Sequence, residues 1–263
     1  MISLAFITPT LGLLSAEEYA LILPNRVPGW PWCVVCPPRK RDALGDMLGG
    51  EAQVIGERST GMYGALNCGV ASTTAKWITY INDDDALGPG FITMAHRHCI
   101  AGNERVIAYG RVAMIDAAGR ELYQFPTTGK ASDRLALWRL GIIPFTQQGM
   151  LFSRLVWETL AGFDESYRYS GDLDFWVRAH LAGFTFKYYD LPAAAWRIRP
   201  GQLSGHHVAV REETERALAP IREMNFPWWV QKQAKLRFRV RNLPQYFWRG
   251  LKLRRLRQAG VFR

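Results

Sequence analysis

The sequence predicts an α/β fold with a mostly parallel sheet flanked by helices on both faces. Strand-like apolar runs alternate with helix-like segments along the first half of the chain. Pro or Gly follows several of these runs, and residues 77–81 are β-branched and aromatic, as in an interior strand. Ligands bind parallel sheets at the carboxyl ends of the strands, so residues that follow strands are the first candidates for a site.

The elements can be assigned in order from these patterns. A turn at Ala118-Gly119 predicts that the strand before it pairs with the strand after it. The expected strands are residues 2–8, 32–36, 52–55, 76–81, 106–115 and 121–125. The expected helices are residues 16–23, 42–48, 62–71, 91–100 and 173–181.

An acidic triplet, Asp83-Asp84-Asp85, comes directly after the expected strand 76–81 and before Gly88-Pro89-Gly90. Adjacent carboxylates repel one another unless a cation lies among them. Oxygen ligands without a nearby cysteine suit Mg²⁺ or Mn²⁺, ions that commonly carry a diphosphate as well. A solvated acidic turn or a helix N-cap would produce the same triplet.

Composition limits the class of protein. A chain of 263 residues with 48% hydrophobic residues can bury one large core. The net charge of +10 is concentrated at the C-terminus, where residues 224–263 hold eleven Lys or Arg and no Asp or Glu. The N-terminus lacks a basic segment and a cleavage site, which indicates a cytoplasmic protein. Cys33 and Cys36 would point to opposite faces of a strand, so we expect reduced thiols and not a zinc site.

Two segments resemble the family 2 glycosyltransferases. GERSTGMYGALNCGVASTTAKWITYINDDD is similar to the donor-binding half, where a Gly-aromatic-x-Ala-x-Asn-x-Gly helix precedes a strand that ends in a DXD-like motif. TQQGMLFSRLVWETLAGFDESYRYSGDLDFWVRAHLAGF is similar to the acceptor-side block, where a Gly-Phe-Asp-Glu turn leads to a catalytic acid and a helix. The resemblance implies the GT-A (Rossmann-like) fold, a UDP- or GDP-sugar donor, a divalent cation, and inversion at the anomeric carbon.

The resemblance also implies roles for individual residues. Asp84 and Asp85 would carry Mn²⁺ or Mg²⁺, while Asp83 would face the nucleotide sugar. The remaining donor contacts would be Thr8, Pro9 and Thr10 at the end of the first strand, Arg58, and Asn67. A solvated loop charge at Arg58 and a helix-backbone contact at Asn67 are the alternatives.

Asp172 takes the position of the catalytic base, with the N-cap of helix 173–181 as the alternative. Asp174 would point elsewhere if the helix has begun, and Asp164 and Glu165 are expected to hold a loop. His206 or His207 would complete the metal shell only if this exposed-looking pair lies over the donor.

The chain also departs from the family. Cys36-Pro37-Pro38-Arg39 replaces the usual acidic turn after the second strand, and Asn82 stands where many members have Asp. These changes leave the identity of the nucleobase open.

We expect a GT-A domain over residues 1–225 and a basic, aromatic, amphipathic helical tail over residues 226–263. Basic and aromatic residues without acids suit the anionic inner face of a membrane, to which the protein would bind peripherally. Nucleic-acid binding and a helix that packs on the domain are the alternatives. The predicted function is transfer of a sugar to a lipid-linked glycan in the biosynthesis of a cell-surface polysaccharide such as lipopolysaccharide. A catalytically silent nucleotide- or glycan-binding member of the fold is the rival.

Overall fold

The computed structural model describes residues 3–13, 15, 29–198 and 206–258, with side chains as far as Leu251 in the last helix. The expected helix 16–23 lies outside the described residues.

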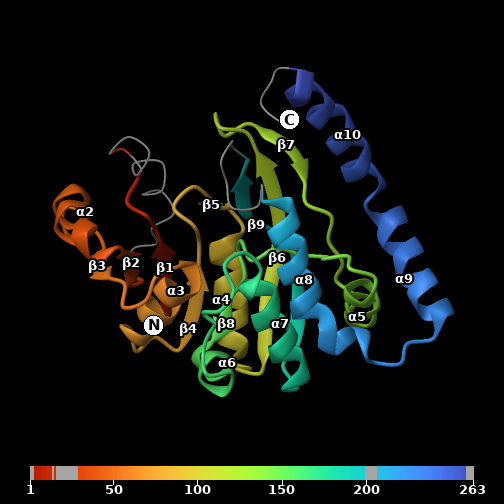
Figure 1. Cartoon of the computed structure of the whole chain (residues 1–263), viewed down its shortest axis with the longest axis horizontal. Coiled ribbons are helices and arrows are strands. Elements are labelled where there is room, and N and C mark those ends of the chain that lie inside the picture. Colours follow the sequence, from red (N-terminus) through yellow and green to blue (C-terminus); the bar gives the residue numbers. More distant parts are fainter. Residues whose placement is uncertain (1–2, 14, 16–28, 199–205, 259–263) are drawn as a thin grey trace.

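The first sheet has the strand order β3-β2-β1-β4-β8, and its first four strands run parallel (Figure 1). β8 pairs with β4 in the antiparallel direction. The strands are β1 (Leu4–Pro9), β2 (Trp32–Cys36), β3 (Gln53–Gly56), β4 (Trp77–Tyr80) and β8 (Phe152–Ser153). The mostly parallel sheet expected from the sequence is therefore confirmed, and the carboxyl ends of β1, β3 and β4 lie at one edge.

A second sheet, with the order β5-β9-β6-β7, was not expected as a separate unit. β9 is its long central strand, parallel to β6 and antiparallel to β5. The expected hairpin between β6 and β7 is present. The strands are β5 (Ala86–Leu87), β6 (Val106–Ile115), β7 (Glu121–Gln124) and β9 (Thr185–Arg197). Because β5 follows the acidic triplet, this triplet lies where the first sheet meets the second.

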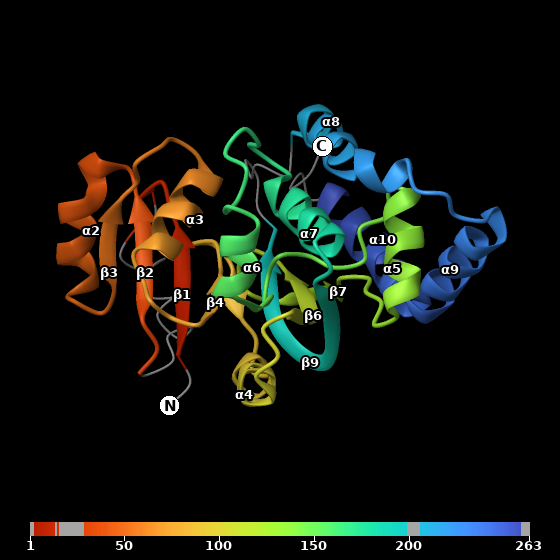
Figure 2. The same ribbon diagram turned by 90° about the horizontal axis from the view of Figure 1, so that it is seen from below.

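Helices cover both faces of the first sheet, because alternate side chains of its strands point to opposite sides (Figure 2). Ile7 contributes to one hydrophobic cluster with α3 and α7, while Phe6 contributes to the other with α2 and α4. A short 3₁₀ helix, η2, spans Pro38–Lys40. The helices up to α7 are α2 (Arg41–Leu48), α3 (Met62–Ala71), α4 (Phe91–Ala101), α5 (Ala131–Arg139), α6 (Arg154–Thr159) and α7 (Gly171–Leu181).

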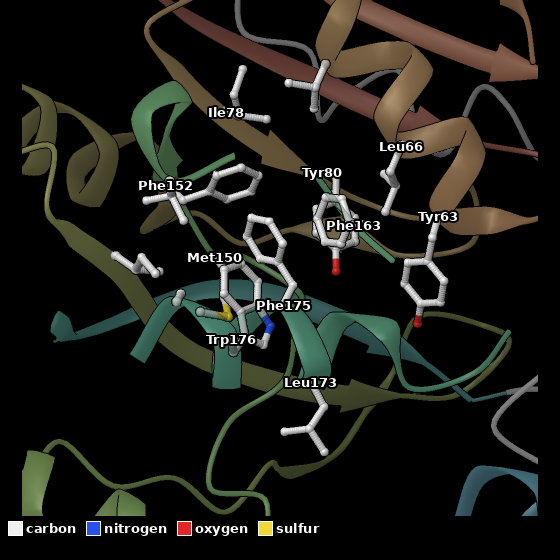
Figure 3. Packing of buried hydrophobic residues seen from close by; sticks show 14 of the residues in the cluster. Tyr63, Leu66, Ile78, Tyr80, Met150, Phe152, Phe163, Leu173, Phe175 and Trp176 are labelled. Carbon is white, nitrogen blue, oxygen red and sulfur yellow. The ribbon is translucent and has the colours of Figure 1, made fainter. Parts of the chain in front are cut away.

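An aromatic cluster joins α3 and β4 of the first half of the chain to α7 of the second half (Figure 3). Phe163 stacks on Phe175 of α7 with ring centroids 4.2 Å apart, and it meets Tyr80 of β4 edge-on at 5.6 Å. Tyr63 of α3 also stacks on Phe163. Burial of these large rings fixes α7 against α3 and β4 and therefore sets the position of the N-terminus of α7.

The C-terminal segment consists of α8 (His207–Arg222), α9 (Trp228–Arg241) and α10 (Leu243–Gln258). Pro244 lies in the first turn of α10, and the described residues of the expected helical tail form the two helices α9 and α10. The composition boundary near residue 226 falls between α8 and α9. α9 packs along α5, with Phe238 buried on its inner side (Figure 1).

Phe238→Ala tests whether α9 is an integral part of the fold. Phe238 is only 2% exposed, and truncation of a buried Phe commonly lowers the free energy of unfolding by about 3–5 kcal/mol. Leu236→Ala is the matched control, because Leu236 is 62% exposed on the same helix and its loss changes stability by about 0.5 kcal/mol or less. Urea unfolding measures the free energy of unfolding of both variants. A change of about 0.5 kcal/mol or less in Phe238→Ala as well would contradict the packing of α9 on the domain.

Candidate active site

Asp83 and Thr10 meet at the carboxyl edge of the first sheet. The Thr10 hydroxyl donates a hydrogen bond of 2.5 Å to Asp83 Oδ2 and accepts one from the Gly12 amide. Pro9, buried at the end of β1, directs the chain toward this contact. The structure thus brings together two of the strand ends that the sequence predicted to share an edge.

Asp85 is buried, only 2% exposed, and its carboxylate is held by three donors. Asp85 Oδ2 accepts hydrogen bonds from Gln148 Nε2 at 2.9 Å and from Asn82 Nδ2 at 3.3 Å. Asp85 Oδ1 accepts one from the Arg197 amide at 3.0 Å. Burial, together with the charge of Asp84, raises the pKa of Asp85 to about 8. The three donors come from separate segments, so Asp85 joins the triplet to the end of β9.

Arg197 extends this junction. Its Nε donates to the Asp84 carbonyl oxygen at 3.0 Å, and its guanidinium also donates to the carbonyl oxygens of Asp116 and Ala117. The β4–β5 turn, the β6–β7 hairpin and the end of β9 are therefore held by one side chain. Asp84 itself is half-buried beside this contact.

Two residues that were predicted to contact the nucleotide-sugar donor, Thr8 and Asn67, have side chains that are bonded away from this edge. Thr8 is fully buried, and its hydroxyl accepts a hydrogen bond from Trp32 Nε1 at 3.0 Å inside the sheet. The Thr8 hydroxyl is therefore used inside the sheet, and the contact of Thr8 with the nucleotide-sugar donor stays a prediction.

Asn67 is committed to the loop that follows α6. Asn67 Oδ1 accepts hydrogen bonds from the Phe163 amide at 2.8 Å and from Trp157 Nε1 at 3.1 Å. Asn67 Nδ2 donates to the Phe163 carbonyl oxygen and to Glu165. All the hydrogen-bonding groups of the amide are used, so Asn67 holds the Gly-Phe-Asp-Glu loop, and its contact with the nucleotide-sugar donor stays a prediction. The expected loop-holding role of Asp164 and Glu165 is confirmed, since Asp164 accepts from the Ser166 amide and pairs with Arg216.

Asp172 lies in the first turn of α7, next to Tyr63 of the aromatic cluster. Asp172 Oδ1 accepts hydrogen bonds from the Leu173 amide at 2.9 Å and from the Tyr63 hydroxyl at 3.4 Å. Burial and, to a lesser extent, the charge of Glu213 raise the pKa of Asp172 to about 6, against the lowering effect of these hydrogen bonds. A carboxyl group with this pKa is ionised near neutral pH and can still accept a proton.

The helix cap is not Asp172. Ser170 occupies the N-cap position of α7, so the alternative role for Asp172 is wrong. Gly171 allows the close approach of α7 to α3, because a Cβ at this position would lie 2.7 Å from the Tyr63 ring. Asp174 is turned away and forms an ion pair with Arg178 at 2.7 Å, as expected.

Glu213 of α8 fixes the loop that leads to Asp172. Its carboxylate accepts hydrogen bonds from the backbone amides of Arg168, Tyr169 and Ser170, at 2.9, 2.7 and 2.8 Å. Three amides that precede a helix would otherwise lack partners, and a carboxylate at a helix N-terminus is favourable. Glu213 therefore positions the backbone that carries Asp172.

The other predicted residues lie at the periphery. Arg58 is exposed beyond the end of β3. His206 and His207 are exposed at the start of α8, and the His206 ring lies 5.6 Å from that of Tyr169. No group of three or more His, Cys, Asp or Glu side chains is arranged to hold a metal within the part of the chain that the structure describes. The cysteines are free, and burial raises the pKa of Cys33 to about 11.

Comparison with known proteins agrees with this arrangement. The structure of TarS 1-349 from S. aureus in complex with UDP-GlcNAc superposes with a TM-score of 0.62, covering 92% of this chain and 73% of that one at 12% identity. The UDP complex of TarS 1-349 gives a TM-score of 0.59 over 92% of this chain and 72% of that chain, at 14% identity. No protein-family model matches the sequence.

The fold is the GT-A fold of glycosyltransferases.

A sequence relative points the same way. An uncharacterised glycosyltransferase of Rickettsia prowazekii (strain Madrid E) is 27% identical over 120 residues, which is 43% of this chain. The matched region spans 37% of the length of that relative. The resemblance to glycosyltransferases noted from the two sequence blocks is thereby confirmed.

Several residues that shape the carboxyl edge of the first sheet were not predicted from the sequence. Gln148 and Arg197 hold the acidic triplet, and Glu213 holds the loop before Asp172. Tyr63 was visible as the aromatic residue of the Gly-aromatic motif, although its contact with Asp172 was not expected. The sequence offers no comparable signal for Glu213, because its partners are backbone amides about 45 residues away in the chain.

Asn67→Ala tests the loop-holding role of this amide. The substitution leaves the Phe163 amide and Trp157 Nε1 without partners, which lowers the free energy of unfolding by about 1–3 kcal/mol. Ser59→Ala removes only an exposed hydrogen bond to Glu165 and serves as the control, with a change of about 0.5 kcal/mol or less. Unchanged stability of Asn67→Ala in urea unfolding would contradict this role.

Proposed function

We propose that this protein is an inverting glycosyltransferase that transfers a sugar from a nucleotide donor to a hydroxyl group of a glycan acceptor. One observation carries the proposal. In a GT-A fold, the Asp172 carboxyl group, with a pKa raised to about 6, lies beside Tyr63 at the edge where β4 ends in three carboxylates. Glycosyl transfer needs an acceptor for the hydroxyl proton and a means to stabilise the charge on the leaving diphosphate, which a cation held by carboxylates can supply.

The donor is proposed to be a UDP-sugar, with a GDP-sugar as the other nucleotide that the sequence left open. TarS complexes with UDP-GlcNAc and with UDP support the first choice. Thr10, Pro9 and Asp83 are proposed to contact the nucleoside, since the Thr10–Asp83 hydrogen bond lies at the end of β1. Arg58, exposed beyond β3, is proposed to contact the diphosphate.

A divalent cation, Mn²⁺ or Mg²⁺, is proposed at the triplet. Hard carboxylate oxygens at a strand end fit such an ion. Asp84 fits as a ligand because it is half-buried and lies between the two other acids. Asp85 fits as a ligand if the cation replaces its hydrogen bond from Asn82, which at 3.3 Å is longer than those from Gln148 and the Arg197 amide. The two shorter hydrogen bonds would continue to hold the turn. When bound, the cation would neutralise the charge that develops on the leaving diphosphate.

Asp172 is proposed to act as the general base. The acceptor hydroxyl oxygen forms the new bond to the anomeric carbon while the bond from this carbon to the diphosphate oxygen breaks. The nucleoside diphosphate leaves with the bonding electron pair, and the hydroxyl proton passes to the Asp172 carboxylate. Attack from the face opposite to the leaving group inverts the anomeric configuration. Glu213 and Tyr63 hold the carboxylate in place for this step.

The acceptor is proposed to be a lipid-linked glycan of a cell-surface polysaccharide, met at the inner face of the membrane. The basic and aromatic residues 226–263 support this assignment, because they suit peripheral contact with an anionic leaflet. No helix among the described residues is both long and apolar enough to cross a bilayer.

Asp172→Asn is expected to lower kcat for sugar transfer by about 10²–10⁴-fold while leaving donor affinity unchanged, because the amide cannot accept the proton. Asp174→Asn is the matched control two residues away. It removes the ion pair with Arg178 and is expected to leave kcat nearly unchanged. Donor affinity is measured by calorimetry with UDP, and full activity of Asp172→Asn would refute its assignment as the base.

The pH profile provides a second test. Because the base must be ionised, kcat/KM should fall about tenfold per pH unit below the Asp172 pKa of about 6 and level off above it. The negative charge of Glu213 contributes to the raised pKa, so Glu213→Gln should move this acidic limb to lower pH. A limb that stays in place in Glu213→Gln would contradict the electrostatic link between the two residues.

A panel of nucleotide sugars tests the donor and the cation together. Hydrolysis of one UDP-sugar with Mn²⁺ is expected, with loss of activity after chelation and after Asp84→Asn. Binding of a nucleotide without any turnover would identify a catalytically silent member of the fold. The absence of both binding and turnover with every nucleotide sugar would refute the proposed function.

A further inference from the structure

We propose that the outward face of α9 and α10 is a docking surface for an anionic lipid bilayer. The surface is defined by an outward stripe of five residues, Trp229, Leu236, Val240, Leu243 and Phe247. The inference deepens the proposed function, since it specifies how the enzyme would meet a membrane-bound acceptor.

The stripe follows from helix geometry. Within α9, Trp229, Leu236 and Val240 are spaced by seven and four residues, which places them on one face when a turn contains about 3.6 residues; Leu243 and Phe247, four residues apart, share one face of α10. Ala234, Phe238 and Asn242 repeat with the same period on the opposite face, and all three are buried against the domain. The ribbon continues from α9 to α10 along one edge of the molecule (Figure 1).

Exposure sets the stripe apart from the rest of the surface. Its five side chains are each between 52% and 67% exposed. Eight of the sixteen exposed large hydrophobic residues in the described part of the chain lie between Trp228 and Trp248. A concentration of apolar side chains in so short a segment marks an interaction surface, whereas single exposed residues elsewhere need no explanation.

Charge selects the partner. Lys232 and Arg239 are exposed beside the stripe, and residues 224–263 contain no Asp or Glu. A second copy of the chain would bring the same positive charge to the contact, so self-association through this face is disfavoured. Single-stranded nucleic acid favours aromatic stacking, which Leu236, Val240 and Leu243 do not offer. Aliphatic groups flanked by cations instead match acyl chains beneath anionic headgroups.

The inner face holds the stripe rigidly. Arg237 forms two hydrogen bonds with the buried Asp133 of α5, at 2.6 and 3.0 Å. Asn242, between the two helices, donates to the Thr127 carbonyl oxygen and accepts from its amide, both at 3.1 Å. The guanidinium of Arg241 lies over the Tyr188 ring. α9 and its junction with α10 are therefore fixed to the domain, so a bilayer bound to the stripe would orient the catalytic edge.

Vesicle flotation of the full chain tests the proposal. The wild-type protein is expected to float with vesicles of phosphatidylcholine and phosphatidylglycerol, and to float less at high salt or with phosphatidylcholine alone. The double variant Leu236→Ser/Phe247→Ser should lower the partition into mixed vesicles by about tenfold or more, because two large apolar groups are lost. Ile100→Ser/Leu181→Ser, which removes two exposed apolar residues from α4 and α7, is the matched control and should float like the wild type.

Each of the other outcomes would overturn the membrane assignment. These outcomes are equal flotation of the stripe variant and the wild type, a dimer in solution that the stripe variant dissociates, or binding of single-stranded RNA that the stripe variant abolishes. Hydrolysis of the nucleotide sugar is measured without vesicles for every variant. A stripe variant that still hydrolyses the nucleotide sugar but no longer floats supports the docking surface. The absence of hydrolysis in the wild type would instead show that the proposed function fails.

Discussion

The buried carboxylate of Asp85 is the contact on which the arrangement of the site depends. A buried carboxyl group without partners is costly, and Asp85 meets donors from Asn82, from Gln148 and from the backbone of Arg197. These donors belong to the β4–β5 turn, to the segment before β8 and to the end of β9. Asp85 therefore joins the turn that follows the first sheet to the end of β9 in the second, and Asp83 and Asp84 lie at the edge beside it.

The second half of the chain is fixed to the first by polar side chains that satisfy loop amides. Asn67 of α3 bonds both backbone groups of Phe163, and Glu213 of α8 accepts from three amides ahead of α7. The aromatic rings around Phe163 supply the burial, but rings alone allow sliding, while hydrogen bonds to backbone fix the register. Asp172 reaches Tyr63 as a consequence, and the acidic turn and the carboxyl group of α7 lie on one edge of the fold.

Patterns local in sequence predicted the elements that are stabilised locally. Residues 62–71 and 106–115 were assigned with the bounds that the structure has, because each is a mainly apolar segment bounded by polar or turn residues. β9 was missed, since Lys187, Asp190 and Pro192 interrupt its pattern and its strand form depends on pairing with β6 and β5.

The candidate site was also predicted only where its residues belong to a local sequence motif. Asp172 and the acidic triplet could be found from the sequence, because their neighbours along the chain form a motif. The hydrogen bonds of Thr8 and Asn67 were not predicted, because their partners, Trp32 and Phe163, lie far away in the sequence and only the fold brings them together. Composition located the basic charge of the tail, but the direction in which its apolar residues point is decided by the contacts of Asp133, Thr127 and Phe238 on the inner face. A helix with weak amphipathic patterning acquires an outward side only when its inner side is docked, and the proposed membrane surface is therefore a property of the fold.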